Sequence, residues 1–166
     1  SDGDDIELAL LGVKFSVLEV PGHTLDHIAY YGDIGLFCGD TLFSAGCGRL
    51  FEGTPDQMFQ SLAKLTALPA DTAVYCTHEY TMANIAFAEA VEPNNQALID
   101  YKNWAHKQRE KNAPTLPSNI HQELAINPFL RCHSAELVTN VSHNMGASIT
   151  SEQATFTALR SWKDKF

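Results

Sequence analysis

The sequence predicts a mixed α/β (α+β) protein, with a strand-rich first part over residues 1–79 and a nearly all-helical second part over residues 80–166. Two patterns predict this division. Up to residue 78, short apolar runs alternate with polar residues and end at glycine or proline, which is typical of strands. After residue 80, apolar residues recur at intervals of three and four, which is typical of helices that bury one face. We therefore expect two domains that meet close to residue 80.

Strands account for most of the first part. The expected strands span residues 14–20, 27–31, 34–38 and 72–76. Pro21-Gly22 ends the first of them, and Gly32-Asp33 joins the second and third as a hairpin turn. A glycine-rich loop, residues 46–53, separates the third strand from the helix that follows it.

One helix is expected between the third and fourth strands. Thr54 is a suitable N-cap, and Pro55 is suited to the first helical position because its missing N–H would have no partner there. Apolar residues then recur at helical spacing until Pro69 closes the helix.

The second part is expected to contain helices only. Apolar residues at helical spacing predict helices around residues 85–91, 97–105 and 156–162. Ser118 is expected to cap a further short helix, after a connector that runs from Pro114 to Pro117. Thr150 and Gln153 form a capping-box signature for the last helix.

Composition and charge exclude some classes of function. The chain has 166 residues, 45% of them hydrophobic, which is enough for one ordinary core or two small ones. A net charge of -9 disfavours nucleic acid as a partner, and an anionic substrate would need a local cluster of basic residues. No apolar stretch is long enough to span a membrane. The four cysteines form no CxxC pair, so we expect free thiols in the cytoplasm.

Three residues at the ends of predicted strands are candidate metal ligands. They are His23 in the run PGHT, Asp40 in CGDT and His78 in CTHEY. A carboxylate at the end of an apolar run is costly unless a cation or several hydrogen bonds compensate it. Because imidazole and carboxylate groups are common ligands of transition metals, the three together indicate a metal centre. Three ligands cannot fill a site for two metals.

Other residues in the same region have simpler interpretations. His27 opens a strand, so we assign it a structural role or one that orients a ligand. Cys47 lies in the glycine-rich loop without a paired base, which disfavours a nucleophile. Four further histidines of the helical part are expected on the surface: His106, His121, His133 and His143.

Several longer runs resemble one enzyme family. They are PGHT (21–24), LFCGDTLF (36–43), GCGRLFEGT (46–54), HEYT (78–81), NPFLR (127–131) and RSWKD (160–164). Together they resemble glyoxalase II, the hydroxyacylglutathione hydrolases of the metallo-β-lactamase superfamily, from about residue 13 to the end of the chain. The short PGHT and GDT runs are typical of the superfamily, whereas the GCGR run and the pair Arg160 and Lys163 are typical of this family.

The resemblance implies a fold and a metal centre. Residues 1–79 would be the C-terminal half of an αββα sandwich, and residues 80–166 an all-α domain that binds glutathione. Two divalent ions, zinc in the first place and iron or manganese as alternatives, would lie between the sheets. His23 would bind one metal and His78 the other, and Asp40 would bridge both and orient the attacking water.

The family's remaining ligands lie in a Thr-His-x-His-x-Asp-His segment that this sequence lacks. We therefore expect the chain to be part of a longer product, to bind metal weakly by itself and to be inactive alone. Half a sandwich would also expose an apolar sheet face and an open edge, so the truncated form should associate, whereas the complete protein should be a monomer.

The resemblance further implies the reaction and the substrate contacts. The family hydrolyses S-(2-hydroxyacyl)glutathione, typically S-D-lactoylglutathione, to D-lactate and glutathione, with no partner beyond this small molecule. Arg160 and Lys163, three apart on the last helix, would meet the glycine carboxylate. Further substrate contacts are implied at Arg49, His78 and Tyr80, and at Phe51, where many members of the family have tyrosine.

Two other functions compete with this one. Another thioester or lactone hydrolase of the superfamily, or an iron-dependent persulfide dioxygenase, would use the same histidine and aspartate runs but generally lacks the helical extension. A non-catalytic fragment that binds glutathione would keep Arg160 and Lys163 and need no complete metal centre.

Overall fold

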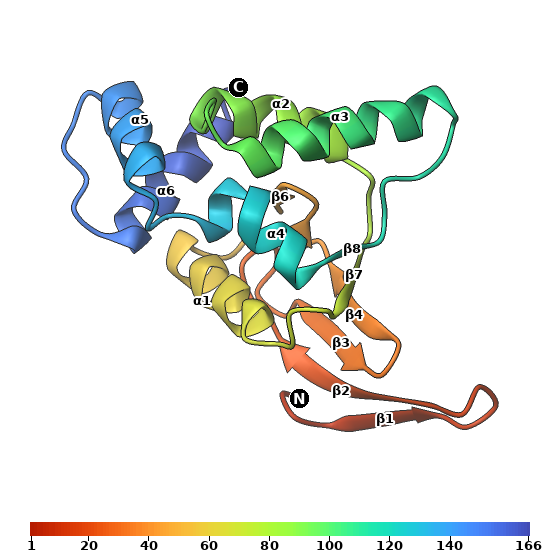
Figure 1. Cartoon of the computed structure of the whole chain (residues 1–166). Helices are drawn as coiled ribbons and strands as arrows, with labels where there is room; N and C mark the ends of the chain where they lie inside the picture. Colours follow the sequence, from red (N-terminus) through yellow and green to blue (C-terminus); the bar gives the residue numbers. More distant parts are fainter.

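The computed structural model describes all 166 residues and contains one main sheet, a small two-stranded sheet and a group of helices (Figure 1). The strands are β1 (Asp5–Leu8), β2 (Val13–Glu19), β3 (Ile28–Gly32), β4 (Gly35–Gly39), β5 (Leu42–Phe43), β6 (Gly46–Cys47), β7 (Ala73–Cys76) and β8 (Ser118–Asn119). The helices are α1 (Pro55–Thr66), α2 (Thr81–Val91), α3 (Gln96–Glu110), α4 (Ile120–Ile126), the 3-10 helix η1 (Pro128–Leu130), α5 (Ala135–Met145) and α6 (Glu152–Lys163). No helix is long and apolar enough to cross a membrane.

The main sheet has the strand order β1-β2-β3-β4-β7-β8. Neighbouring strands are antiparallel except β4 and β7, which are parallel and are connected through the β5-β6 ribbon and α1. The predicted hairpin between β3 and β4 is confirmed, with Tyr30 opposite Phe37. The last strand of the sheet, β8, comes from the helical part of the chain, where only helices were expected.

One face of the main sheet forms the core with the helices. Leu36 and Val74, which face each other on β4 and β7, are fully buried in the same cluster as Leu62 of α1 and Phe156 of α6. Burying side chains of this size contributes about 1.5–3 kcal/mol each. A smaller cluster joins α2, α3 and α4. The sheet and the helices on the two sides of the cavity described below are thus each held in a packed cluster.

The opposite face of the sheet carries a row of aromatic side chains. Phe15, Tyr30, Phe37 and Tyr75 come from four successive strands, and the Phe37 and Tyr75 rings stack with centroids 4.9 Å apart. Tyr75 remains 38% exposed. At one edge of the same sheet, strand β1 is exposed along its whole length. An apolar face and an open edge are therefore present, as the sequence predicted.

Helix starts show where local prediction was accurate and where it was wrong. The cap of α1 is confirmed, since the Thr54 hydroxyl accepts from the Gln57 backbone and a full capping box forms. The predicted caps of the other two helices are each wrong by one residue: Asn119 caps α4 in place of Ser118, and Ser151 caps α6 in place of Thr150. The helix α5 and strand β1 were not predicted.

Candidate functional site

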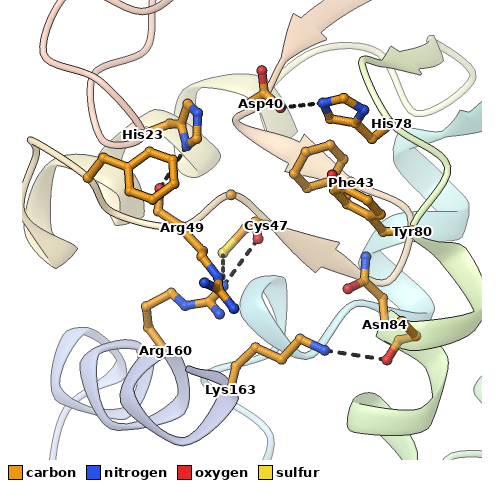
Figure 2. Close-up of a pocket in the computed structure, with 13 residues that line it drawn as sticks. His23, Asp40, Phe43, Cys47, Arg49, His78, Tyr80, Asn84, Arg160 and Lys163 are labelled. Atoms are coloured by element: carbon orange, nitrogen blue, oxygen red, sulfur yellow. Dashed lines mark hydrogen bonds and ion pairs between the residues drawn. The ribbon is translucent and has the colours of Figure 1, made fainter. Parts of the chain in front are cut away.

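A cavity of about 570 Å³ lies between the end of the sheet and the helices (Figure 2). Every candidate site residue from the sequence lines it: His23, Asp40, Arg49, Phe51, His78, Tyr80, Arg160 and Lys163. Figure 2 shows Asp40 and His78 on one side of the cavity, and Arg160 and Lys163 of α6 on the other. The fold thus brings together residues that are up to 140 positions apart in the sequence.

The three candidate metal ligands follow strands that run in the same direction. His23 comes after β2, Asp40 after β4 and His78 after β7. β2 and β4 are each antiparallel to β3, and β7 is parallel to β4, so all three strands end at one edge of the sheet. The nearest pair is His78 Nε2 and Asp40 Oδ1, 3.5 Å apart. The topology therefore explains why residues of three separate runs share one cavity.

Backbone contacts fix His23 and Asp40. The Nδ1 atom of His23 lies 2.8 Å from the Arg49 carbonyl oxygen, and as a donor to that oxygen it leaves Nε2 with a free lone pair. The Asp40 N–H donates to Nε2 of His27 at 2.9 Å. Burial lowers the pKa of His27, and the neighbouring His23 lowers it further. His27 thus supports the loop that carries Asp40.

Glycine is required at Gly48, where two of these loops meet. A Cβ atom there would overlap the Asp40 carbonyl oxygen and lie 3.4 Å from Nδ1 of His23. Gly48 N–H also donates to the Thr41 carbonyl oxygen at 3.1 Å. The glycine-rich loop is therefore packed directly against both candidate ligands.

The donors fit part of a metal centre in kind but not in number. One carboxylate and two imidazoles are ligands that zinc, iron and manganese accept. In the structure, no three or more His, Cys, Asp or Glu side chains lie close enough to one another to hold a metal ion. His23, Asp40 and His78 can therefore contribute ligands, but a closed site needs donors beyond these three.

Aromatic rings cover the side of the cavity next to His78. The Tyr80 ring stacks on the His78 ring with centroids 5.0 Å apart, and Phe43 lies 5.3 Å from Tyr80. On the other side, Phe51 lies 4.9 Å from the His23 ring and is 70% exposed. An extended ligand could thus lie between these rings.

Two basic side chains, Lys163 and Arg49, face the cavity and differ in how far they are buried. Lys163 is half-buried, its Nζ donates to the Ala83 carbonyl oxygen at 3.3 Å, and it lies 4.9 Å from the Phe87 ring centre. Burial lowers the pKa of Lys163, and the charges of Arg160 and Arg49 lower it further. The side chain of Arg49 is exposed. These are the cations that an anionic ligand can reach most directly.

Arg160 lines the cavity but is largely engaged within the protein. Its Nη1 donates to the Cys47 carbonyl oxygen at 3.1 Å and its Nη2 to Asp164 at 2.9 Å, while the side chain is only 4% exposed. Its buried Nε has no partner. Burial also raises the pKa of the Cys47 thiol, which further disfavours Cys47 as a nucleophile. A role of Arg160 in substrate binding stays a prediction.

Sequence patterns did not single out Phe43 or Asn84, although both line the cavity. Asn84 is buried on α2, and its Nδ2 donates to the Ser44 carbonyl oxygen at 3.0 Å. Phe43 belongs to a run that was used only for the resemblance. No periodicity marks either residue, because their role depends on contacts between elements distant in sequence. The four histidines expected on the surface are all exposed.

Two family models match the chain without overlap. The first, described as the C-terminus of hydroxyacylglutathione hydrolase, matches residues 79–166, more than half of the chain. The chain belongs to the hydroxyacylglutathione hydrolase family. The second model, the metallo-beta-lactamase superfamily, matches residues 1–78. Membership of this superfamily indicates a divalent metal.

Curated hydroxyacylglutathione hydrolases are similar over almost the whole chain. The protein from Shewanella pealeana is 56% identical over 98% of this chain, and this chain covers 62% of it. The protein from Nitrosomonas europaea is 49% identical over 100% of this chain, which covers 63% of it. The one from Vibrio parahaemolyticus is 53% identical over 99%, with 64% of it covered. The chain thus spans less than two thirds of the length of these hydroxyacylglutathione hydrolases.

Solved structures show the same fold at low identity. ETHE1 from Myxococcus xanthus matches with a TM-score of 0.56 and 24% identity, over 98% of this chain and 58% of that one. A metallo-beta-lactamase from Staphylococcus aureus matches with a TM-score of 0.55 and 19% identity, over 96% and 42%. The mixed α/β fold predicted from the sequence, a partial metallo-β-lactamase domain followed by helices, is confirmed.

Proposed function

We propose that the whole protein hydrolyses S-(2-hydroxyacyl)glutathione thioesters, such as S-D-lactoylglutathione, to the free hydroxy acid, here D-lactate, and glutathione. One observation carries the proposal: candidate metal ligands and reachable basic side chains line the same cavity. A metal-dependent thioester hydrolase with an anionic substrate needs both kinds of residue in one place. The names of the similar curated proteins support the same reaction.

His23, Asp40 and His78 are proposed as ligands of two divalent metal ions, zinc in the first place and iron or manganese as alternatives. Bound at such a site, the metals supply a nucleophile at neutral pH and polarise the thioester carbonyl. Asp40 is proposed to contact both metals and to orient the nucleophile, and His27 to hold the Asp40 loop in place through its hydrogen bond to the Asp40 N–H. Neither a serine nor a cysteine nucleophile is required.

The glutathione part of the substrate is proposed to lie along α6 and the rings of the cavity. Glutathione carries two carboxylates and one ammonium group, so a net negative ligand meets Lys163 and Arg49. Arg160 is proposed to meet a glutathione carboxylate together with Lys163 and to hold the Cys47 backbone. Tyr80 offers a hydroxyl to the peptide, whereas Phe51 offers only a ring face.

The two parts of the chain are proposed to divide these tasks. Residues 1–79 would carry the metal ligands, and residues 80–166 the glutathione contacts. Since the chain supplies only three metal donors, we expect no hydrolysis by residues 1–166 alone. The cytoplasm is the proposed compartment, on the basis of cysteine usage.

The test compares two proteins in a thioester assay. One is the chain itself, and the other carries the additional N-terminal segment of the Shewanella pealeana relative. With added zinc, the longer protein should release thiol from S-D-lactoylglutathione and the chain alone should not. No thiol release by the longer protein at any zinc concentration would contradict the proposal.

Binding without hydrolysis is the second candidate for the chain by itself. It is favoured because His23, Asp40 and His78 form no group that could hold a metal ion by themselves, while Lys163 and Arg49 line the cavity and can meet an anion. Titration with S-methylglutathione, which has no thioester to cleave, measures this binding directly.

A further inference from the structure

Side chains of the helical part hold the turn between β5 and β6, residues 43–46, in addition to the short ladder between the two strands. Asn127 Nδ2 donates to the carbonyl oxygens of Phe43 (3.1 Å) and Gly46 (2.9 Å), Asn84 Nδ2 donates to that of Ser44 (3.0 Å), and Glu123 Oε2 accepts from the Ala45 N–H (2.9 Å). Four successive residues therefore each have a backbone group bound by a side chain from α2, α4 or the residue after α4. A ribbon with only two residues per strand could not hold this shape by its own ladder.

The turn also contains an unfavourable backbone conformation. Ala45 has a φ of 55°, in the left-handed region that residues with a Cβ rarely adopt. Ala45 is fully buried, so its N–H needs an acceptor inside the protein. Glu123 provides that acceptor.

Glu123 acts here through hydrogen bonds and not through a charge pair. It is 0% exposed, and no Lys, Arg or His forms an ion pair with it. Asn127, also 0% exposed, donates to its Oε2 at 3.0 Å. Burial raises the pKa of the Glu123 carboxyl, against the opposing effect of these donors. Both donors meet Oε2, while the buried Oε1 has no hydrogen-bond partner, so the carboxyl group is committed to the Ala45 N–H and to Asn127.

Three residues that line the cavity, Asp40, Arg49 and His23, depend on where this turn lies. The chain enters the ribbon from Asp40 and leaves it towards Arg49, whose carbonyl oxygen holds His23. Within the ribbon, the Phe43 ring lies 6.3 Å from that of His78. A displaced turn would therefore shift the candidate metal ligands and Arg49 together.

We propose that Glu123 and Asn127 are positioning residues: they fix the 43–46 turn and, through it, the places of Asp40, His23 and Arg49. That these three serve a glutathione thioesterase rests on the proposed function. The positioning role gives the NPFLR run, which begins at Asn127, a task that neither metal nor substrate contact explains.

Amide hydrogen exchange in the full chain tests the proposal without any ligand. The quantity measured is the exchange rate at Ala45 divided by that at Leu36, a core amide of β4, which removes the effect of a general loss of stability. E123L should raise this ratio about tenfold or more, because a buried N–H loses its acceptor. E123Q keeps an acceptor oxygen and should stay within about threefold of the unchanged protein.

Glu92 offers a matched control. It is 1% exposed and accepts two hydrogen bonds from Arg131, away from the cavity, so E92Q should lower stability and leave the ratio unchanged. If E123L does not fold, N127S removes the donor to Phe43 and Gly46 and should raise the ratio in the same way. An unchanged ratio in whichever of E123L and N127S folds, or in both, would overturn the positioning role.

Titration with S-methylglutathione separates this proposal from the proposed function. E123L or N127S should weaken binding about tenfold, and E123Q and E92Q less than about threefold. If the unchanged chain does not bind S-methylglutathione, the glutathione site is contradicted, while the exchange ratio still decides whether Glu123 and Asn127 hold the turn.

Discussion

Replacing Gly48 with alanine should disrupt the site more than its one added methyl group suggests. The new Cβ would overlap the Asp40 carbonyl oxygen and lie 3.1 Å from the carbonyl carbon, so backbone and not a flexible side chain must move. Overpacking of this kind costs about 1–3 kcal/mol. For a chain of this size, that corresponds to a fall in Tm of roughly 2–12 °C.

The assay pairs thermal unfolding with titration by S-methylglutathione. Gly146 is a suitable control, because a Cβ there meets nothing within 4 Å, although its φ of 65° is unfavourable for alanine. G146A should therefore lower Tm by only a few degrees and leave binding unchanged, whereas G48A should lower Tm and also weaken binding at least about fivefold. If G48A bound S-methylglutathione as tightly as the unchanged chain, the packing of this loop against Asp40 and His23 would not control the site.

Three further predictions concern Lys163 and the aromatic face of the sheet. K163M should raise the Kd for S-methylglutathione about three- to tenfold by calorimetry, since one charge-assisted contact is lost, and the surface variant K107M should not change it. Because the pKa of Lys163 is lowered, the affinity for S-methylglutathione should be full at neutral pH and fall as pH rises through a value below the ordinary lysine pKa of about 10.4. K163R should keep its affinity to higher pH. Identical pH profiles of binding for K163R and the unchanged chain would exclude Lys163 as the cation. The chain should self-associate through its aromatic sheet face, and F37E should reduce the association constant about tenfold or more in sedimentation experiments. No association by the unchanged chain at high concentration would contradict the exposed face as a contact surface.

Local sequence signals were accurate where a short segment determines its own structure. Thr54 and Pro55 start α1 because capping needs only neighbouring backbone groups. The β3–β4 hairpin was predicted for the same reason, since its turn and its alternating residues are adjacent in sequence. The exposed β1 strand and helix α5 were missed. For α5 the signals were present, since Ser134 stands at its N-cap position and Gly146 ends it in the left-handed conformation.

The contents of the cavity followed from residue type and resemblance, but their arrangement did not. The runs around His23, Asp40 and His78 indicated ligands, and the structure adds that three strands of the same direction end at one edge. The engagement of Arg160 with Cys47, 113 residues away, could not be read from helical spacing. Contacts of this range depend on the packing of α6 against the rest of the molecule, which no local pattern records.

Metal content is the measurement that bears most directly on the site. The longer protein, with the N-terminal segment of the Shewanella pealeana relative, should retain about two zinc ions per polypeptide after dialysis. D40N should lose most of this zinc, because Asp40 is proposed to contact both ions, while K107M should retain it. Equal zinc content in D40N and the unchanged protein would contradict the placing of a metal centre at His23, Asp40 and His78.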